Sequence, residues 1–203
     1  DTVSLTFHTL NFYKREDGTQ YITIYEPKFI DVSTQKVDDA ATAVSIAKQK
    51  ELLVQKRLQK FPTDDEPHKS VMQVHYRGKS AHMDWRIKVD NHLLGPTMFI
   101  LRKAEITEDV TSVQQAKSIE KSWDRYFKLK NVPQTEIEDP RRKIRVSWKA
   151  PEPLDWLNVE KVVPKGEVGA TKFEYGVFSI VDRPTVFFGV QKEYFKEFFI
   201  EGK

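Results

Sequence analysis

Alternation of apolar and polar residues along the chain predicts a series of β-strands. Successive side chains of a strand point to opposite faces of a sheet, so alternation marks a strand with one buried face. Turn sequences separate these segments: Glu16-Asp17-Gly18, Gly78-Lys79-Ser80-Ala81 and the tight Asp90-Asn91. The expected strands lie at 2–10, 21–25, 71–77, 83–89, 93–101 and 143–149.

Two other segments repeat their apolar residues every three or four positions, which predicts α-helices. Residues 38–58 carry a broad apolar stripe, and Asp38 or Asp39 can cap the first turn. Residues 112–128 carry the second stripe, and Thr111 with Gln114 predicts a capping box. The expected fold is therefore mainly β, of the α+β class, with two helices flanking the strands.

A polar break from Pro62 to Pro67 separates the first helix from the later strands. Proline interrupts regular structure because its ring fixes φ and it has no backbone N–H to donate. We therefore expect an N-terminal extension at residues 1–69 and a main domain at residues 70–203.

Composition limits the chemistry open to the chain. Hydrophobic residues make up 39% and charged residues 31% of the 203, which is typical of a soluble globular protein. The chain has no cysteine, so His, Asp or Glu must hold any metal. A net charge of +3 permits a polyanionic partner. No apolar run approaches the roughly 18 residues that span a bilayer, so no membrane partner is expected.

Candidate chemistry gathers on the predicted strand at 83–89 and the residue before it. A period of two places His82, Asp84, Arg86 and Lys88 on one face and an apolar set on the other. On the preceding strand, Gln73, His75 and Arg77 share a face. If the two strands pair as a hairpin, His75 lies across from His82 or Asp84.

Two imidazoles and one carboxylate on one face form a ligand set for a divalent cation such as manganese, iron or zinc. An arginine beside that set, here Arg86, can hold a phosphate through its planar fork of donors. The alternative is that these polar residues form an ordinary solvated face of a sheet. Spacing alone leaves both interpretations open.

A second cluster is basic. Lys143, Arg145 and Lys149 share one face of the predicted strand at 143–149. Such a face can track a phosphate backbone and so bind nucleic acid. The interpretation that we prefer for this cluster is an ordinary exposed edge strand, which lysines protect from aggregation.

Four sequence blocks resemble the 3′-phosphoesterase domain of bacterial and archaeal DNA ligase D. The first two are Gln73-Val74-His75 and His82-Met83-Asp84-Trp85-Arg86. The same order resumes downstream with Pro153-Leu154-Asp155-Trp156 and then Val163-Pro164-Lys165-Gly166-Glu167-Val168-Gly169-Ala170. The resemblance covers about residue 70 to the C-terminus.

The resemblance implies a compact β-barrel with a manganese-type cation held by His75, His82 and Asp84, and with Arg86 on the scissile phosphate. The family removes 3′ phosphates and 3′ ribonucleosides from DNA ends during repair, so nucleic-acid 3′ ends are the implied partner. We expect a cytoplasmic protein of prokaryotic or viral origin. Because the chain begins at Asp1 and enters a strand pattern at once, we also expect it to be part of a larger polypeptide or assembly.

The chain departs from the family pattern around Glu152. The family has a catalytic His at that position and an acidic residue where this chain has Ala150. The family tyrosines are replaced by Trp156 and Val168, and the loop between the two His residues is one residue longer. Glu152 could bind a cation or act as a base, so we regard it, with Arg86, as a catalytic candidate.

Three hypotheses follow. The first is a metal-dependent phosphoesterase acting on nucleic-acid 3′ ends. The second is a non-catalytic barrel that serves as a nucleic-acid-binding or assembly module, in a larger complex or a virus particle. The third is a phosphoesterase with a different substrate, for which Glu152 is the adaptation.

Overall fold

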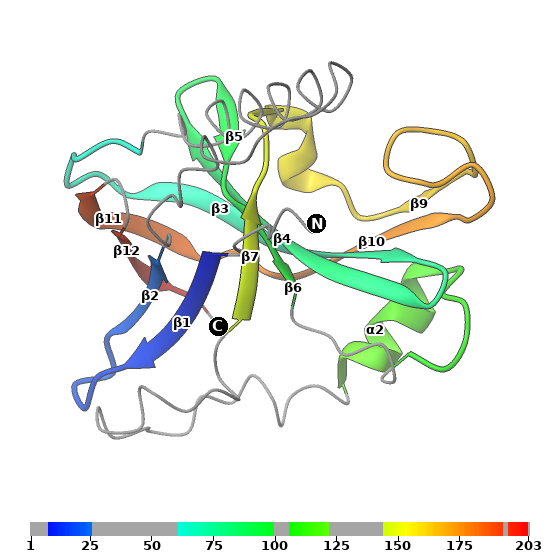
Figure 1. Cartoon of the computed structure of the whole chain (residues 1–203), viewed down its shortest axis with the longest axis horizontal. Coiled ribbons are helices and arrows are strands. Elements are labelled where there is room, and N and C mark those ends of the chain that lie inside the picture. Colours follow the sequence, from blue (N-terminus) through cyan, green and yellow to red (C-terminus); the bar gives the residue numbers. More distant parts are fainter. Residues whose placement is uncertain (1–7, 26–60, 100–105, 122–143, 193–194, 203) are drawn as a thin grey trace, which may run out of the picture.

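The computed structural model of the chain describes residues 8–25, 61–99, 106–121, 144–192 and 195–202 (Figure 1). The helix expected at 38–58 and the candidate residue Lys143 lie outside these ranges. Within them the fold is mainly β, as predicted, and one large antiparallel sheet dominates it. Its strands are β1 (His8–Lys14), β2 (Gln20–Tyr25), β3 (His68–Arg77), β4 (Ser80–Val89), β5 (His92–Leu94), β6 (Pro96–Phe99), β7 (Ile144–Trp148), β8 (Glu152–Pro153), β9 (Val162–Val163), β10 (Gly176–Asp182), β11 (Thr185–Lys192) and β12 (Phe195–Glu201).

The pairing of the strands returns on itself. The sheet order is β8-β5-β4-β6-β7-β1-β2-β12-β11-β3-β10-β9, and β3 also pairs with β4. This extra pairing closes a ring of eight strands, from β4 through β6, β7, β1, β2, β12 and β11 to β3. The hairpin of β1 and β2 lies between β7 and β12, so part of the expected extension 1–69 shares one sheet with the expected main domain.

The predicted strand at 93–101 is divided within its described part. Gly95 separates β5 from β6 with a φ of 143°, and a Cβ at this position would lie 2.0 Å from the backbone oxygen of Trp85. A glycine accepts both the conformation and the close approach. The break lets β4 pair first with β6, through Met83 and Asp84, and then with β5.

Two boundary predictions need correction. Residues 2–7 of the first expected strand lie outside the described residues, and β1 continues past the expected end at residue 10 to Lys14, which pairs with Gln20 of β2. Within the described residues the helix expected at 112–128 is α2 (Val113–Lys121), and residues 122–128 of the prediction lie outside them. Its capping residue is Ser112 rather than Thr111. The Ser112 hydroxyl accepts from the backbone N–H of Gln115, while the Gln115 side chain accepts from the N–H of Thr111.

The inner face of the ring carries the apolar core. Trp85, Trp148, Tyr76 and Phe198 are among its largest fully buried side chains, and each alternates along its strand with residues of the outer face. The core fixes the register of the strands, because a slip by one residue would turn the apolar set outward. It therefore also fixes which polar side chains meet on the outer face. Among the described residues, no helix has the length and apolarity that crossing a bilayer requires.

Candidate metal centre

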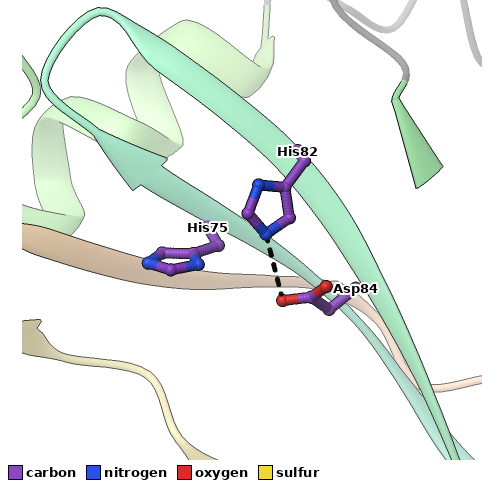
Figure 2. Close-up of side chains that lie close together, drawn as sticks. All are labelled: His75, His82 and Asp84. Carbon is purple, nitrogen blue, oxygen red and sulfur yellow. Dashed lines mark ion pairs between the residues drawn. The ribbon is translucent and has the colours of Figure 1, made fainter. Parts of the chain in front are cut away.

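The hairpin of β3 and β4 brings the predicted ligands together. In its register His75 lies opposite His82, and Gln73 lies opposite Asp84, so all four side chains share one face as predicted. The candidate donor atoms of His75, His82 and Asp84 all lie within 4.8 Å of one another. Figure 2 shows the three side chains directed toward one another from the two paired strands.

His75 is held as a neutral imidazole. Its burial, followed by the proximity of His82, lowers its pKa to about 4, so the ring carries no charge at pH 7. Nε2 donates to the backbone oxygen of Gly169 at 2.5 Å, since a carbonyl can only accept. The lone pair of the neutral ring is therefore on Nδ1, and a backbone carbonyl that fixes the tautomer is a common support of metal-binding histidines. The ring also stacks on Phe178, with 4.2 Å between centroids.

His82 and Asp84 have the spacing of two ligands of one cation. Nε2 of His82 lies 3.4 Å from Oδ2 of Asp84. Two donors that each lie about 2.1 Å from a tetrahedral cation are about 3.4 Å apart. Bonds of about 2.1 Å join donors up to about 4.2 Å apart, so cation binding needs the widest pair to close by no more than about 0.6 Å.

Asp84 is buried but remains ionised. Burial raises the pKa of its carboxyl, yet the contact with His82 and the charges of Lys149 and Arg86 outweigh burial and hold the pKa well below its usual range. Thr97 also donates to Oδ1 at 2.8 Å. The carboxylate is thus charged and oriented before any cation arrives.

Arg86 lies in the deep end of the centre, with 4% of its side chain exposed. Its Nε donates to Glu152 at 2.8 Å, and its Nη1 donates to the side-chain oxygen of Gln73. Trp156 covers the guanidinium, at 5.1 Å from the ring centroid. Glu152 also forms an ion pair with Lys149. The Nζ atom of Lys149 lies 3.1 Å from the Glu152 carboxylate and 3.7 Å from the Asp84 carboxylate.

No protein-family model, curated protein or solved structure matches the chain. The resemblance to the ligase D phosphoesterase domain therefore stays a prediction from the four sequence blocks. The residues of those blocks do lie together in the structure. Gly169 of the fourth block accepts from His75 of the first, and Trp156 of the third block covers Arg86 of the second, although the third and fourth blocks lie far downstream in the sequence.

The predicted basic face is divided by the structure. Lys149 lies inside the centre, between Asp84 and Glu152, and burial lowers the pKa of its amine while the two carboxylates oppose that shift. Arg145 lies on β7 and is exposed. The strand that carries Arg145 was predicted correctly, but the burial of Arg145 and of Lys149 depends on which segments cover the sheet at each position.

Sequence reasoning missed Thr97, Phe178 and the supporting role of Gln73. Thr97 lies in a predicted strand whose face could not be assigned across the break at Gly95. Phe178 lies opposite His75 in the pairing of β10 with β3, and the loop residue Gly169 packs on Phe178, so no local sequence pattern predicts either contact. Gln73 carried a usable signal, since it shares the face of His75.

The centre contains the imidazoles of His75 and His82, the carboxylates of Asp84 and Glu152, and the cationic side chains of Arg86 and Lys149. The carboxylates of Asp84 and Glu152 balance Arg86 and Lys149, so a divalent cation on the ligand set would make the centre electropositive. Such an arrangement suits an anionic ligand with several oxygen atoms, of which a phosphate is the commonest example.

Proposed function

We propose that the chain is a divalent-metal-dependent phosphoesterase that acts on nucleic-acid 3′ ends, with manganese as the preferred cation. The observation that carries the proposal is the convergence of His75, His82 and Asp84 on one buried face next to Arg86. Imidazole and carboxylate ligands together suit a first-row divalent cation. The four sequence blocks supply the substrate class.

The same resemblance extends to the architecture. We propose that the closed ring of eight strands is a compact β-barrel. In this proposal two helices flank the barrel, α2 being one and the segment 38–58 the other.

In this proposal each residue of the centre has a separate role in phosphate-ester cleavage. His75, His82 and Asp84 would hold the cation, which supplies Lewis-acid polarisation of a phosphoryl oxygen. His75 is neutral and Asp84 is ionised, so neither has to lose a proton before it can bind a cation. Arg86 and Lys149 would orient the phosphate and offset its charge.

Removal of a 3′ phosphate tests the proposal. The protein is incubated with Mn²⁺ and a primer–template that ends in a 3′-phosphate or in a single 3′ ribonucleotide. We expect trimming of the 3′ end that requires Mn²⁺ and stops when EDTA is added. A folded protein that binds Mn²⁺ and leaves both ends intact would contradict this function.

The pairing of Glu152 with Arg86 favours a second candidate function. A carboxylate that accepts from Arg86 and Lys149 takes up donors that a phosphate would use. If the Glu152 carboxylate keeps these donors, the proposed barrel is a binding or assembly module without hydrolysis. The other possibility is a phosphoesterase for another substrate.

Replacing Glu152 with glutamine separates these possibilities. We expect the Glu152→Gln variant to bind inorganic phosphate about tenfold more tightly in the presence of Mn²⁺, because a like charge is removed next to the phosphate. Isothermal titration calorimetry measures the affinity, and the exposed Glu66→Gln is the control for net charge. Unchanged phosphate affinity would mean that Glu152 does not compete for the phosphate position. A simultaneous fall in trimming would show that the Glu152 carboxylate contributes to the reaction, directly or through Arg86 and Lys149.

A further inference from the structure

The centre is deep at one end and open at the other. Arg86 is 3% exposed, whereas Phe99 on β6 is 45% exposed. The register explains the arrangement: Met83 pairs with Met98, so one step further along the strands places Phe99 beside His82. The two rings lie 6.4 Å apart between centroids.

The row of side chains continues past Phe99. In the pairing of β6 with β7, Phe99 lies opposite Arg145, which is exposed. One cross-strand row on the outer face therefore reads His75, His82, Phe99, Arg145. Neighbouring strands are about 4.8 Å apart, so Arg145 lies about 10 Å from His82 along this row.

We propose that Phe99 and Arg145 form the binding site for the unpaired strand that leads to the scissile 3′ phosphate. The proposal rests on the proposed function, because it takes the cation ligands as the position of that phosphate. The terminal base stacks on the exposed face of Phe99, and the next phosphate toward the 5′ end pairs with Arg145. Aromatic side chains beside cations are the usual platform for single-stranded nucleic acid.

The depth of the centre sets the direction of the strand. Lys149 lies between Asp84 and Glu152, and Trp156 of the 3-10 helix Leu154–Asn158 covers the Arg86 guanidinium, so we place the scissile phosphate at this buried end. The nucleoside must leave by the open end, where Phe99 lies. A strand with a free 3′ phosphate satisfies both conditions, whereas a duplex end would have to unpair its last base.

Binding without turnover tests the inference. A fluorescein-labelled ten-nucleotide single strand with a 3′ phosphate is titrated with protein in EDTA, and fluorescence anisotropy gives Kd. We expect Phe99→Leu, which keeps the apolar bulk and removes the ring, to weaken binding about fivefold or more. Phe99→Tyr, which keeps the ring, should bind as the parent does. With a strand whose last nucleotide is abasic, Phe99→Leu and the parent should bind alike.

The salt dependence of binding tests the phosphate contact of Arg145. We expect Arg145→Gln to reduce the slope of log Kd against log salt by about 0.7, the value for one phosphate contact on a single strand. Arg15→Gln, at the turn between β1 and β2, removes the same charge and should leave that slope unchanged. Thermal unfolding verifies that each variant is folded.

The inference is overturned if the parent does not bind the strand, if Phe99→Leu binds it as the parent does, or if Phe99→Leu weakens the abasic strand equally. An unchanged salt slope for Arg145→Gln also overturns it. Because no cation or hydrolysis enters the titration, these outcomes are independent of the trimming assay. If the variants change binding as expected and the trimming assay shows no hydrolysis, the strand-binding site is supported and only the hydrolytic function is rejected.

Discussion

Replacing Asp84 with asparagine is expected to weaken Mn²⁺ binding by more than about a hundredfold and to reduce 3′-end trimming to background. Asp84 is the only anionic member of the three-residue ligand set, and its carboxylate is charged and oriented by Thr97 and Arg86. The amide keeps the shape of the side chain and removes the charge. Electron paramagnetic resonance of free Mn²⁺ gives the affinity, and the trimming assay gives the activity.

The same substitution should cost stability. It leaves Arg86 and Lys149 with one carboxylate, Glu152, in a buried centre, and the loss of one partner from such a group costs about 3 kcal/mol. Asp65→Asn is the matched control, because Asp65 is exposed and lies away from the centre. Wild-type Mn²⁺ affinity in Asp84→Asn would remove Asp84 from the ligand set.

Acidification is expected to destabilise the metal-free protein by about 3 kcal/mol between pH 6.5 and pH 4. In the folded protein the pKa of His75 is lowered from 6.5 to about 4. Between these values the unfolded chain holds a proton on this residue and the folded chain does not, so the free energy of unfolding falls as the pH falls. The depressed pKa of Asp84 adds a further loss in the same direction at still lower pH.

Urea unfolding in EDTA across this range measures the effect. His75→Gln should remove most of the pH dependence between 6.5 and 4, because glutamine does not titrate. His92→Gln leaves His75 in place and should retain the dependence. Equal pH slopes for the parent and His75→Gln would show that His75 is not held neutral by burial.

The hairpin that carries the ligands could be predicted from the sequence because its signals are local. Period-two alternation in 82–89 separates His82 and Asp84 from Trp85, and a Gly-Lys turn limits how the two strands can pair. The apolar face then fixes the register, since a slip by one residue would bury the polar side chains in the core. The local sequence pattern is therefore sufficient to predict that His75, His82 and Asp84 face one another.

The support of those ligands could not be predicted in the same way. Gly169 packs against Gly176 and Phe178 of β10, and β10 pairs with β3, which places the Gly169 carbonyl at His75. Glu152 lies near Arg86 because β8 pairs with β5. Pairings between distant segments depend on the whole core rather than on any one strand. Lys149 illustrates the limit: its face was predicted, but its burial against Asp84 follows from the neighbouring strands.

Anomalous diffraction from a crystal grown with Mn²⁺ tests most directly that His75, His82 and Asp84 hold one divalent cation. We predict a single strong anomalous peak on the outer face of the hairpin, about 2.0–2.3 Å from Nδ1 of His75, Nε2 of His82 and a carboxylate oxygen of Asp84. In that structure Nε2 of His75 still donates to the Gly169 carbonyl. Absence of a peak at these atoms in a crystal soaked at saturating Mn²⁺, or a His75 ring turned away from the other two side chains, would contradict the metal centre.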